Sequence, residues 1–140
     1  MDEPVKTYLD VRYGETDAMG VVYYANYFTY FEVGRTHFFR HWGTDYAHLE
    51  KMGIFAPVIA ASCRYLAPAR YGDELCLRTC LSQLGPVRLV FAYDLACVRR
   101  EMTIARGSTT HAFVNESGRP LALKKHHPDL WQRLSAAVSP

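Results

Sequence analysis

Asp17 is the residue whose position in the sequence most clearly indicates chemistry. It lies in the stretch ETDAMGVVYYANYFTYFE (residues 15–32), where a short turn leads into a segment rich in tyrosine and phenylalanine. The segment from Gly20 and Val21 to Asn26 precedes an expected helix, and the first N–H groups of a helix are unpaired donors with partial positive charge. Such donors can stabilise the oxyanion that forms when a thioester carbonyl is attacked. A carboxylate one turn away can attack that carbonyl or deprotonate water, although an aspartate in a turn can also serve only to cap its own loop.

The other reactive side chains lack the sequence partners that their chemistry would need. His37 and His41 are four residues apart on the expected helix, but no third ligand for a metal ion lies near them in the sequence. His126 and His127 stand in a polar C-terminal segment and are interpreted as part of a solvated tail. Cys63 has no neighbour that would generate a thiolate. No phosphate-binding glycine loop, H-E-x-x-H or G-x-S-x-G motif is present, so neither a metal nor a cofactor is predicted.

Composition limits the class of protein. The chain has 140 residues, 49% of them hydrophobic and 21% charged, which is typical of one globular domain, here residues 1–140. A net charge of +2 does not favour nucleic-acid binding. The N-terminal MDEPVKTYLD has charges where a signal peptide needs apolar residues, and no apolar run reaches the ~20 residues of a membrane span. The four cysteines show no metal-binding spacing, and the cytosol is the expected compartment.

The hydrophobic pattern predicts one long helix and several strands. The helix runs from Tyr27 to Trp42, with Asn26 as its N-cap and Gly43 as its stop. Two shorter helices are expected at 45–51 and 128–136. Alternating or continuously apolar segments predict strands at 5–13, 58–66, 74–82, 88–98 and 102–114. Consecutive strands with short connections form antiparallel hairpins, and the aromatic helix must bury one face on their sheet, so the predicted class is α+β.

Three segments carry a resemblance to a known family. Residues 11–35, VRYGETDAMGVVYYANYFTYFEVGR, resemble the signature of the 4-hydroxybenzoyl-CoA thioesterase family and are most similar to the bacterial acyl-CoA thioesterases associated with the Tol–Pal envelope system. YLAPARYGDEL (65–75) and FVNESGRPLAL (113–123) are similar too. The resemblance implies a hotdog fold, in which a curved antiparallel sheet wraps one long helix. It also implies acyl-CoA hydrolysis without a cofactor, and a homodimer or dimer of dimers whose sites lie between subunits.

The resemblance also assigns residues. Asp17 matches the family's catalytic carboxylate, and the backbone N–H of Tyr24 matches its oxyanion donor. Tyr24 is also a departure, because Tol–Pal-associated members usually have histidine there, whereas hydroxybenzoyl-CoA enzymes have tyrosine. Glu32 aligns with an acidic residue near the site of members that act on aromatic substrates, or it is simply an exposed helix carboxylate. Gly20, Val21 and Asn26 are expected to contact the substrate.

A CoA substrate also needs partners for its phosphates. Arg88 follows the turn at Gly85-Pro86, where family members place basic residues for the nucleotide. Further candidates, each of which could equally be a solvated surface charge, are Arg64, Arg70, Arg99, Arg100, Lys124 and Lys125.

The sequence does not determine which acyl group is preferred or whether CoA or acyl carrier protein carries it. Two rival functions are a non-catalytic module that binds acyl-CoA or acyl carrier protein and a hotdog dehydratase or hydratase, although the histidine-centred motif of the latter class is absent from the sequence.

Overall fold

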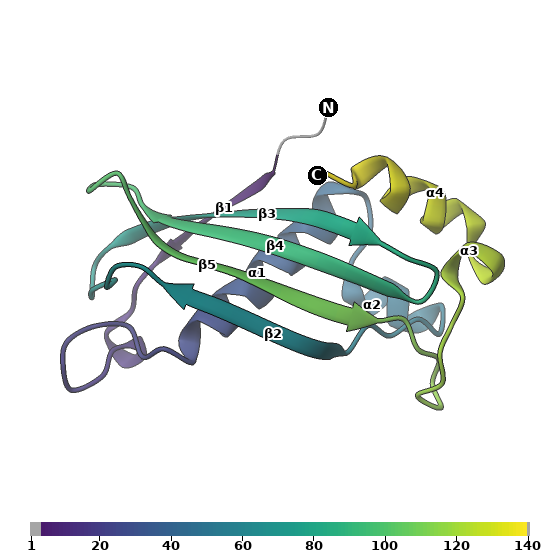
Figure 1. The fold of residues 1–140 in the computed structure, drawn as a ribbon, viewed down its shortest axis with the longest axis horizontal. Coiled ribbons are helices and arrows are strands. Elements are labelled where there is room, and N and C mark those ends of the chain that lie inside the picture. Colours follow the sequence, from purple (N-terminus) through teal and green to yellow (C-terminus); the bar gives the residue numbers. More distant parts are fainter. Residues whose placement is uncertain (1–3, 140) are drawn as a thin grey trace.

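The computed structural model describes residues 4–139. Five strands form one antiparallel sheet in the order β1-β3-β4-β5-β2. The strands are β1 (Val5–Asp10), β2 (Val58–Tyr65), β3 (Glu74–Leu84), β4 (Arg88–Cys97) and β5 (Met102–Ala112). In Figure 1 the sheet lies in front of the long helix α1 (Asn26–His41), and the short helices lie at one end of the sheet. These are α2 (Tyr46–Lys51), α3 (Leu123–His126) and α4 (Pro128–Ala137).

The core lies between α1 and the inner face of the sheet. Alternate residues of β3 and β4 point to this face, so that Leu75, Leu77 and Leu81 of β3 are fully buried. Phe31 of α1 stacks on Tyr93 of β4 with their ring centroids 4.2 Å apart. These contacts confirm the predicted α+β class and the hotdog arrangement of one helix enclosed by an antiparallel sheet.

The helix approaches the sheet closely at Gly34. A Cβ built there would lie 2.6 Å from Leu77 Cδ2 and would also overlap Thr79 Oγ1. Only glycine permits this approach, which brings the middle of α1 against β3.

Several predicted boundaries need correction. Asn26 is the first residue of α1 and not its N-cap, which is Ala25 and makes no side-chain cap bond. The Asn26 side chain instead donates from Nδ2 to the carbonyl oxygen of Glu15 at 2.9 Å, which holds the preceding loop. The first strand ends at Asp10, because its pairing with β3 ends at Glu74, and the short 3-10 turn Tyr13–Glu15 follows.

The C-terminal segment is also more ordered than predicted. His126 ends α3, and His127 joins α3 to α4, so the two histidines do not lie in a tail. Leu123 and Leu130 are buried and attach these helices to the core, although His126 itself is exposed as expected. Gly43 follows α1 with φ +84°, which confirms it as the stop of the helix.

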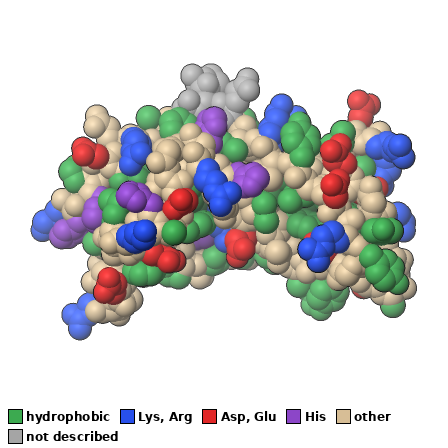
Figure 2. Space-filling model, turned by 180° about the vertical axis from the view of Figure 1, so that it is seen from behind, with side chains coloured by type: hydrophobic (Ala, Val, Ile, Leu, Met, Phe, Trp, Pro, Cys, Tyr) green, Lys and Arg blue, Asp and Glu red, His purple; other side chains and the backbone are tan. Residues whose placement is uncertain are grey.

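The surface behind the sheet is mixed in charge. Figure 2 shows lysines and arginines interspersed with aspartates and glutamates, and histidines spread from one end of the molecule to about its middle. Among the described residues, no helix is both long and apolar enough to cross a membrane.

Candidate active site

Asp17 lies in a tight loop that its own backbone and side chain hold together. The Gly20 N–H donates to the Asp17 carbonyl oxygen at 3.0 Å, and the Asp17 N–H donates to the Val21 carbonyl oxygen at 2.9 Å. Gly20 has φ +78°, a left-handed conformation that favours glycine. The carboxylate oxygen Oδ1 accepts a hydrogen bond of 2.8 Å from the Met19 N–H, so Asp17 does cap its own loop. Within residues 4–139 no donor is bonded to the other oxygen, Oδ2, which leaves it available for chemistry.

The half-buried Asp17 faces a cavity of about 360 Å³. The cavity is bounded by the Asp17 loop, the start of α1, and the end of β2 with the segment after it. Its lining residues are Asp17, Val21, Val22, Tyr24, Tyr27, Tyr65, Leu66, Ala67 and Pro68. The structure therefore places the two predicted catalytic residues, Asp17 and Tyr24, at one cavity.

The wall formed by residues 66–70 is joined to the Asp17 loop by backbone pairing. Val21 forms an antiparallel bridge with Arg70, and the Val22 N–H donates to the Ala69 carbonyl oxygen at 2.8 Å. The Leu66 N–H donates to the Ile104 carbonyl oxygen at 2.8 Å, which attaches the wall to the sheet. The loop and the wall are thus one hydrogen-bonded unit.

The start of α1 presents two free donors. Of the described residues, none accepts a hydrogen bond from the backbone N–H of Tyr24 or of Ala25. The next N–H, that of Asn26, already donates to the Tyr23 carbonyl oxygen at 2.9 Å. Free N–H groups at a helix start carry partial positive charge and suit a developing oxyanion.

Tyr65 is a site residue that sequence reasoning does not identify. Its hydroxyl donates to the Tyr24 carbonyl oxygen at 3.1 Å, and its ring packs edge-on against Tyr27 with the centroids 5.1 Å apart. Burial raises the pKa of Tyr65 to about 12, so the hydroxyl remains a donor at neutral pH. The segment 58–66 reads as almost continuously apolar, and without alternation the pattern does not tell which face of β2 Tyr65 occupies.

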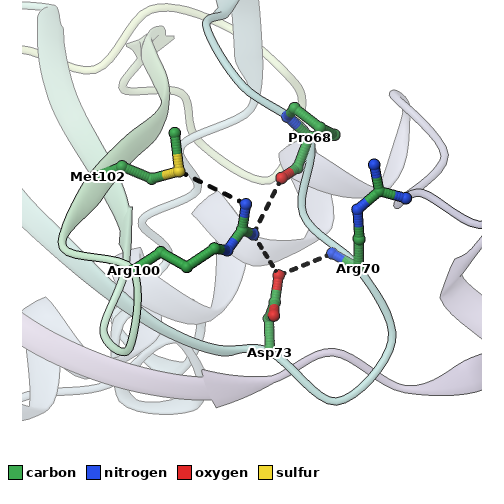
Figure 3. A network of polar contacts seen from close by, with 5 residues as sticks. All are labelled: Pro68, Arg70, Asp73, Arg100 and Met102. Carbon is green, nitrogen blue, oxygen red and sulfur yellow. Dashed lines mark hydrogen bonds and ion pairs between the residues drawn. The ribbon is translucent and has the colours of Figure 1, made fainter.

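Arg100 holds the same wall from outside the cavity. Figure 3 shows its guanidinium between Asp73, Pro68 and Met102. Arg100 Nη2 lies 2.6 Å from Asp73 Oδ2 and donates to the Pro68 carbonyl oxygen at 3.1 Å. Asp73 Oδ2 also accepts from the Arg70 N–H at 2.8 Å. Arg100, one of the candidates for phosphate binding, is thus bonded to the protein's own carboxylate and backbone.

Glu32 is not brought to the Asp17 cavity. It is exposed on α1 and lines a separate cavity of about 330 Å³ with Arg35, Tyr46 and the segment 56–58.

Arg88 lies at the far end of the sheet from Asp17. It pairs with Ala112 of β5, whereas Tyr65 pairs with Ala105. These β5 positions are separated by about 23 Å, at ~3.3 Å per residue in a strand. The Leu123 N–H donates to the Pro86 carbonyl oxygen at 3.2 Å, which holds the segment carrying the exposed Lys124 and Lys125 beside the turn that precedes Arg88.

Cys63 and His37 do not line the Asp17 cavity. Burial raises the pKa of the Cys63 thiol, which disfavours the thiolate that a nucleophile needs. His37 Nδ1 lies 3.3 Å from Thr7 Oγ1. Between residues 4 and 139, no three His, Cys, Asp or Glu side chains are arranged to hold a metal ion.

Comparison with known proteins identifies relatives across most of the chain. A profile described as the thioesterase-like superfamily matches residues 11–136. The Bacillus subtilis protein YneP is 34% identical over 124 residues, which cover 89% of this chain and 90% of that protein. The Helicobacter pylori (strain J99) protein named acyl-CoA thioesterase YbgC is 29% identical over 136 residues, with 91% and 97% covered. A crystal structure of DHNA-CoA thioesterase from Staphylococcus aureus matches with a TM-score of 0.89 and 30% identity, over 94% of this chain and 88% of that chain.

Proposed function

Because this chain belongs to the thioesterase-like superfamily, we propose that it is an acyl-CoA thioesterase, which hydrolyses a thioester to a free carboxylate and CoA. The observation that carries the proposal is that Asp17 and the helix start with the free N–H groups of Tyr24 and Ala25 meet at one cavity. In the described part of the chain, Asp17 Oδ2 accepts no hydrogen bond and the N–H groups of Tyr24 and Ala25 donate none, and acyl transfer to water needs such an oxygen and such donors.

The Asp17 carboxylate has two chemically balanced routes. As a general base, it takes a proton from water while the water oxygen bonds to the thioester carbon; the C–S bond then breaks, and the proton passes to the CoA thiolate. As a nucleophile, it bonds to the carbonyl carbon while the C–S bond breaks and the thiolate leaves; water then cleaves the resulting anhydride, which restores the Asp17 carboxylate, and a proton from that water passes to the thiolate. In both routes the negative charge develops on the carbonyl oxygen, where the N–H groups of Tyr24 and Ala25 stabilise it.

We place the protein in the 4-hydroxybenzoyl-CoA thioesterase family within this superfamily, on the signature at residues 11–35. Within that family, the signature as a whole is most similar to the Tol–Pal-associated branch, whereas Tyr24 matches the hydroxybenzoyl branch. Gly20 and Val21 shape the loop beside the substrate carbonyl, and Asn26 holds that loop through its bond to Glu15. The proposed carrier of the acyl group is CoA or acyl carrier protein, and the proposed compartment is the cytosol, where the free thiols of the four cysteines are maintained.

The nucleotide end of CoA is assigned to Arg88. Its proximity to the segment carrying Lys124 and Lys125 supports this assignment, because grouped cations suit phosphates better than one exposed arginine. The distance from Asp17 implies that Arg88 meets a substrate bound at the Asp17 cavity of another copy of the chain.

We therefore also propose a homo-oligomer, a dimer or a dimer of dimers. Within residues 4–139 the edge strand β2 pairs with β5 alone, and its Val58 and Ile59 are 46% and 48% exposed. Natural proteins usually cover such an edge. In the dimer that we propose, a second β2 covers it and brings the exposed Glu32 of one copy nearer to the substrate of the other. An active monomer in sedimentation at assay concentration would contradict this assembly.

Release of free CoA tests the proposed function. The wild-type protein is assayed with aromatic, short, medium and long acyl-CoAs, and the best substrate is then used for Asp17→Asn. This variant keeps the shape of the side chain but removes the attacking or proton-accepting oxygen, so kcat should fall at least ~100-fold. The exposed Asp10→Asn is the matched control and should behave as wild type.

The rival functions have distinct outcomes in the same samples. A protein that binds acyl-CoA but releases no thiol is a binding module. Addition of water to an unsaturated acyl-CoA, again without free thiol, would indicate a hydratase.

A further inference from the structure

Two consecutive peptide units at the start of α1 carry the two free donors. The unit between Tyr23 and Tyr24 carries the Tyr24 N–H, and the unit between Tyr24 and Ala25 carries the Ala25 N–H. No peptide bond between residues 4 and 139 is cis. In a planar trans unit the C=O and N–H point in opposite directions, so whatever holds the carbonyl also fixes the direction of the donor.

Each carbonyl is held by a different partner. The Tyr23 carbonyl oxygen accepts from the Asn26 N–H at 2.9 Å, a bond made within the turn that begins α1. The Tyr24 carbonyl oxygen accepts from the Tyr65 hydroxyl at 3.1 Å and only at 3.4 Å from the Tyr27 N–H. The direction of the Ala25 N–H therefore depends mainly on a side chain from β2, an element distant in sequence.

Tyr65 is itself well placed to serve as this anchor. Its backbone pairs with Ala105 of β5, and its ring packs edge-on against both Tyr27 and Tyr24, with centroids 5.1 and 6.4 Å away. The ring contacts restrict the side chain, and the raised pKa keeps the hydroxyl protonated as a donor. The anchor is thus held by the sheet on one side and by α1 on the other.

We propose that Tyr65 is a positioning residue of the oxyanion site: its hydroxyl orients the Tyr24–Ala25 peptide so that the Ala25 N–H donates to the charge that develops on the thioester oxygen. A bond accepted at the carbonyl also polarises the amide and strengthens its N–H as a donor. This inference rests on the proposed function, because it assigns Tyr65 a part in that same reaction. Tyr65 acts through the backbone and need not touch the substrate.

Tyr65→Phe separates positioning from packing. The variant keeps the ring and its contacts but removes the bond to the Tyr24 carbonyl. We expect kcat to fall roughly three- to tenfold, the range that the net effect of one neutral hydrogen bond allows, with KM within about twofold of wild type. The matched control is Tyr71→Phe, because the 65% exposed Tyr71 forms no hydrogen bond through its hydroxyl with any described residue. Both variants should stay folded, with melting temperatures within a few degrees of the wild-type value.

A transition-state mimic gives a second readout. A trifluoromethyl ketone analogue of the best acyl-CoA, which adds an oxygen nucleophile to form a tetrahedral oxyanion-like species, should bind Tyr65→Phe more weakly by about the factor lost in kcat/KM. A role in packing alone would not produce this match.

The outcomes are distinguishable. If kcat is unchanged in Tyr65→Phe, whether or not KM rises, Tyr65 does not position the oxyanion site. The proposed function still stands in that case, provided that the wild-type protein releases CoA. A wild-type protein that releases no CoA from any thioester overturns the proposed function and this inference together.

Discussion

The Arg100 guanidinium contacts Pro68, which lies 32 residues earlier in the sequence. Arg100 Nη2 contacts Asp73 Oδ2 at 2.6 Å and the Pro68 carbonyl oxygen at 3.1 Å. Pro68 lines the Asp17 cavity, and the neighbouring Ala69 and Arg70 pair with the Asp17 loop. One exposed ion pair therefore restrains a wall of the candidate active site.

Arg100→Ala should loosen that wall without removing any group that contacts the substrate. We expect a modest fall in kcat/KM of about two- to fivefold and a lower melting temperature. Exposed ion pairs usually contribute little to folding stability, but this one belongs to a network of several hydrogen bonds. The matched control is Arg106→Ala, because Arg106 forms a longer and more exposed pair with Asp94 at 3.6 Å. Equal losses in the two variants would show that the Arg100 contacts have no special link to the cavity.

Variants of Tyr24 distinguish the catalytic contribution of its main-chain N–H from that of its side chain. If its main-chain N–H holds the oxyanion, Tyr24→Phe should lose less than ~5-fold in kcat, an effect of roughly 1 kcal/mol. Tyr24→Pro removes the donor and should abolish activity, since loss of one oxyanion donor typically costs ~100-fold or more. Circular dichroism of the proline variant controls for damage to the start of α1. If kcat falls as much in Tyr24→Phe as in Asp17→Asn, the Tyr24 hydroxyl takes part in the reaction and the oxyanion site must be reassigned.

Arg88→Ala should raise KM several-fold and leave kcat nearly unchanged. A phosphate contact made equally in the ground and transition states is uniform binding, which appears in KM alone. The effect should vanish with a truncated pantetheine thioester, which has no nucleotide. Arg78→Ala, which removes an exposed arginine from the middle of β3, is the control. Equal damage to both thioesters would refute the nucleotide assignment.

His111 makes stability depend on pH through a buried hydrogen-bond chain. The residue is 1% exposed, with Nε2 2.8 Å from Thr109 Oγ1 and Nδ1 2.8 Å from the Ala56 carbonyl oxygen. Thr109 Oγ1 in turn lies 2.7 Å from the Tyr93 hydroxyl, which accepts from Arg35. Burial lowers the pKa of His111 below its ordinary value of 6.5, chiefly because the core disfavours the charged ring.

The sign of the pH effect follows from this shift. Below about pH 6.5 the unfolded chain binds a proton that the folded chain resists, so the stability that the neutral His111 contributes is present above pH 6.5 and is lost as the pH falls toward the lower folded pKa. The melting temperature of the wild type should therefore fall more between pH 7 and pH 5 than that of His111→Gln. The exposed His126→Gln should keep the wild-type slope. Parallel curves for wild type and His111→Gln would rule out this source of pH dependence.

Much of the fold follows from local sequence patterns. The alternation of Leu75, Leu77 and Leu81 predicts a strand with one buried face, and those residues are fully buried on β3. The change of period after Asn26 predicts α1, and Gly43 marks its end. The errors lie at boundaries, where the outcome depends on distant partners: Asn26 bonds to Glu15 instead of capping the helix, and β1 ends where β3 no longer pairs with it.

The sequence by itself determined the α+β class, the place of Asp17 just before the aromatic helix, and the likeness to a thioesterase family. These properties depend on residues close together in the chain. Only the tertiary structure decided which distant residues share the Asp17 cavity. It brought Tyr65 and Pro68 to Asp17, bonded Arg100 to the wall, and placed Arg88 at the other end of the sheet. The physical reason is that strand register and helix packing fix these neighbours through contacts between segments far apart in the chain, which the local order of residues does not encode.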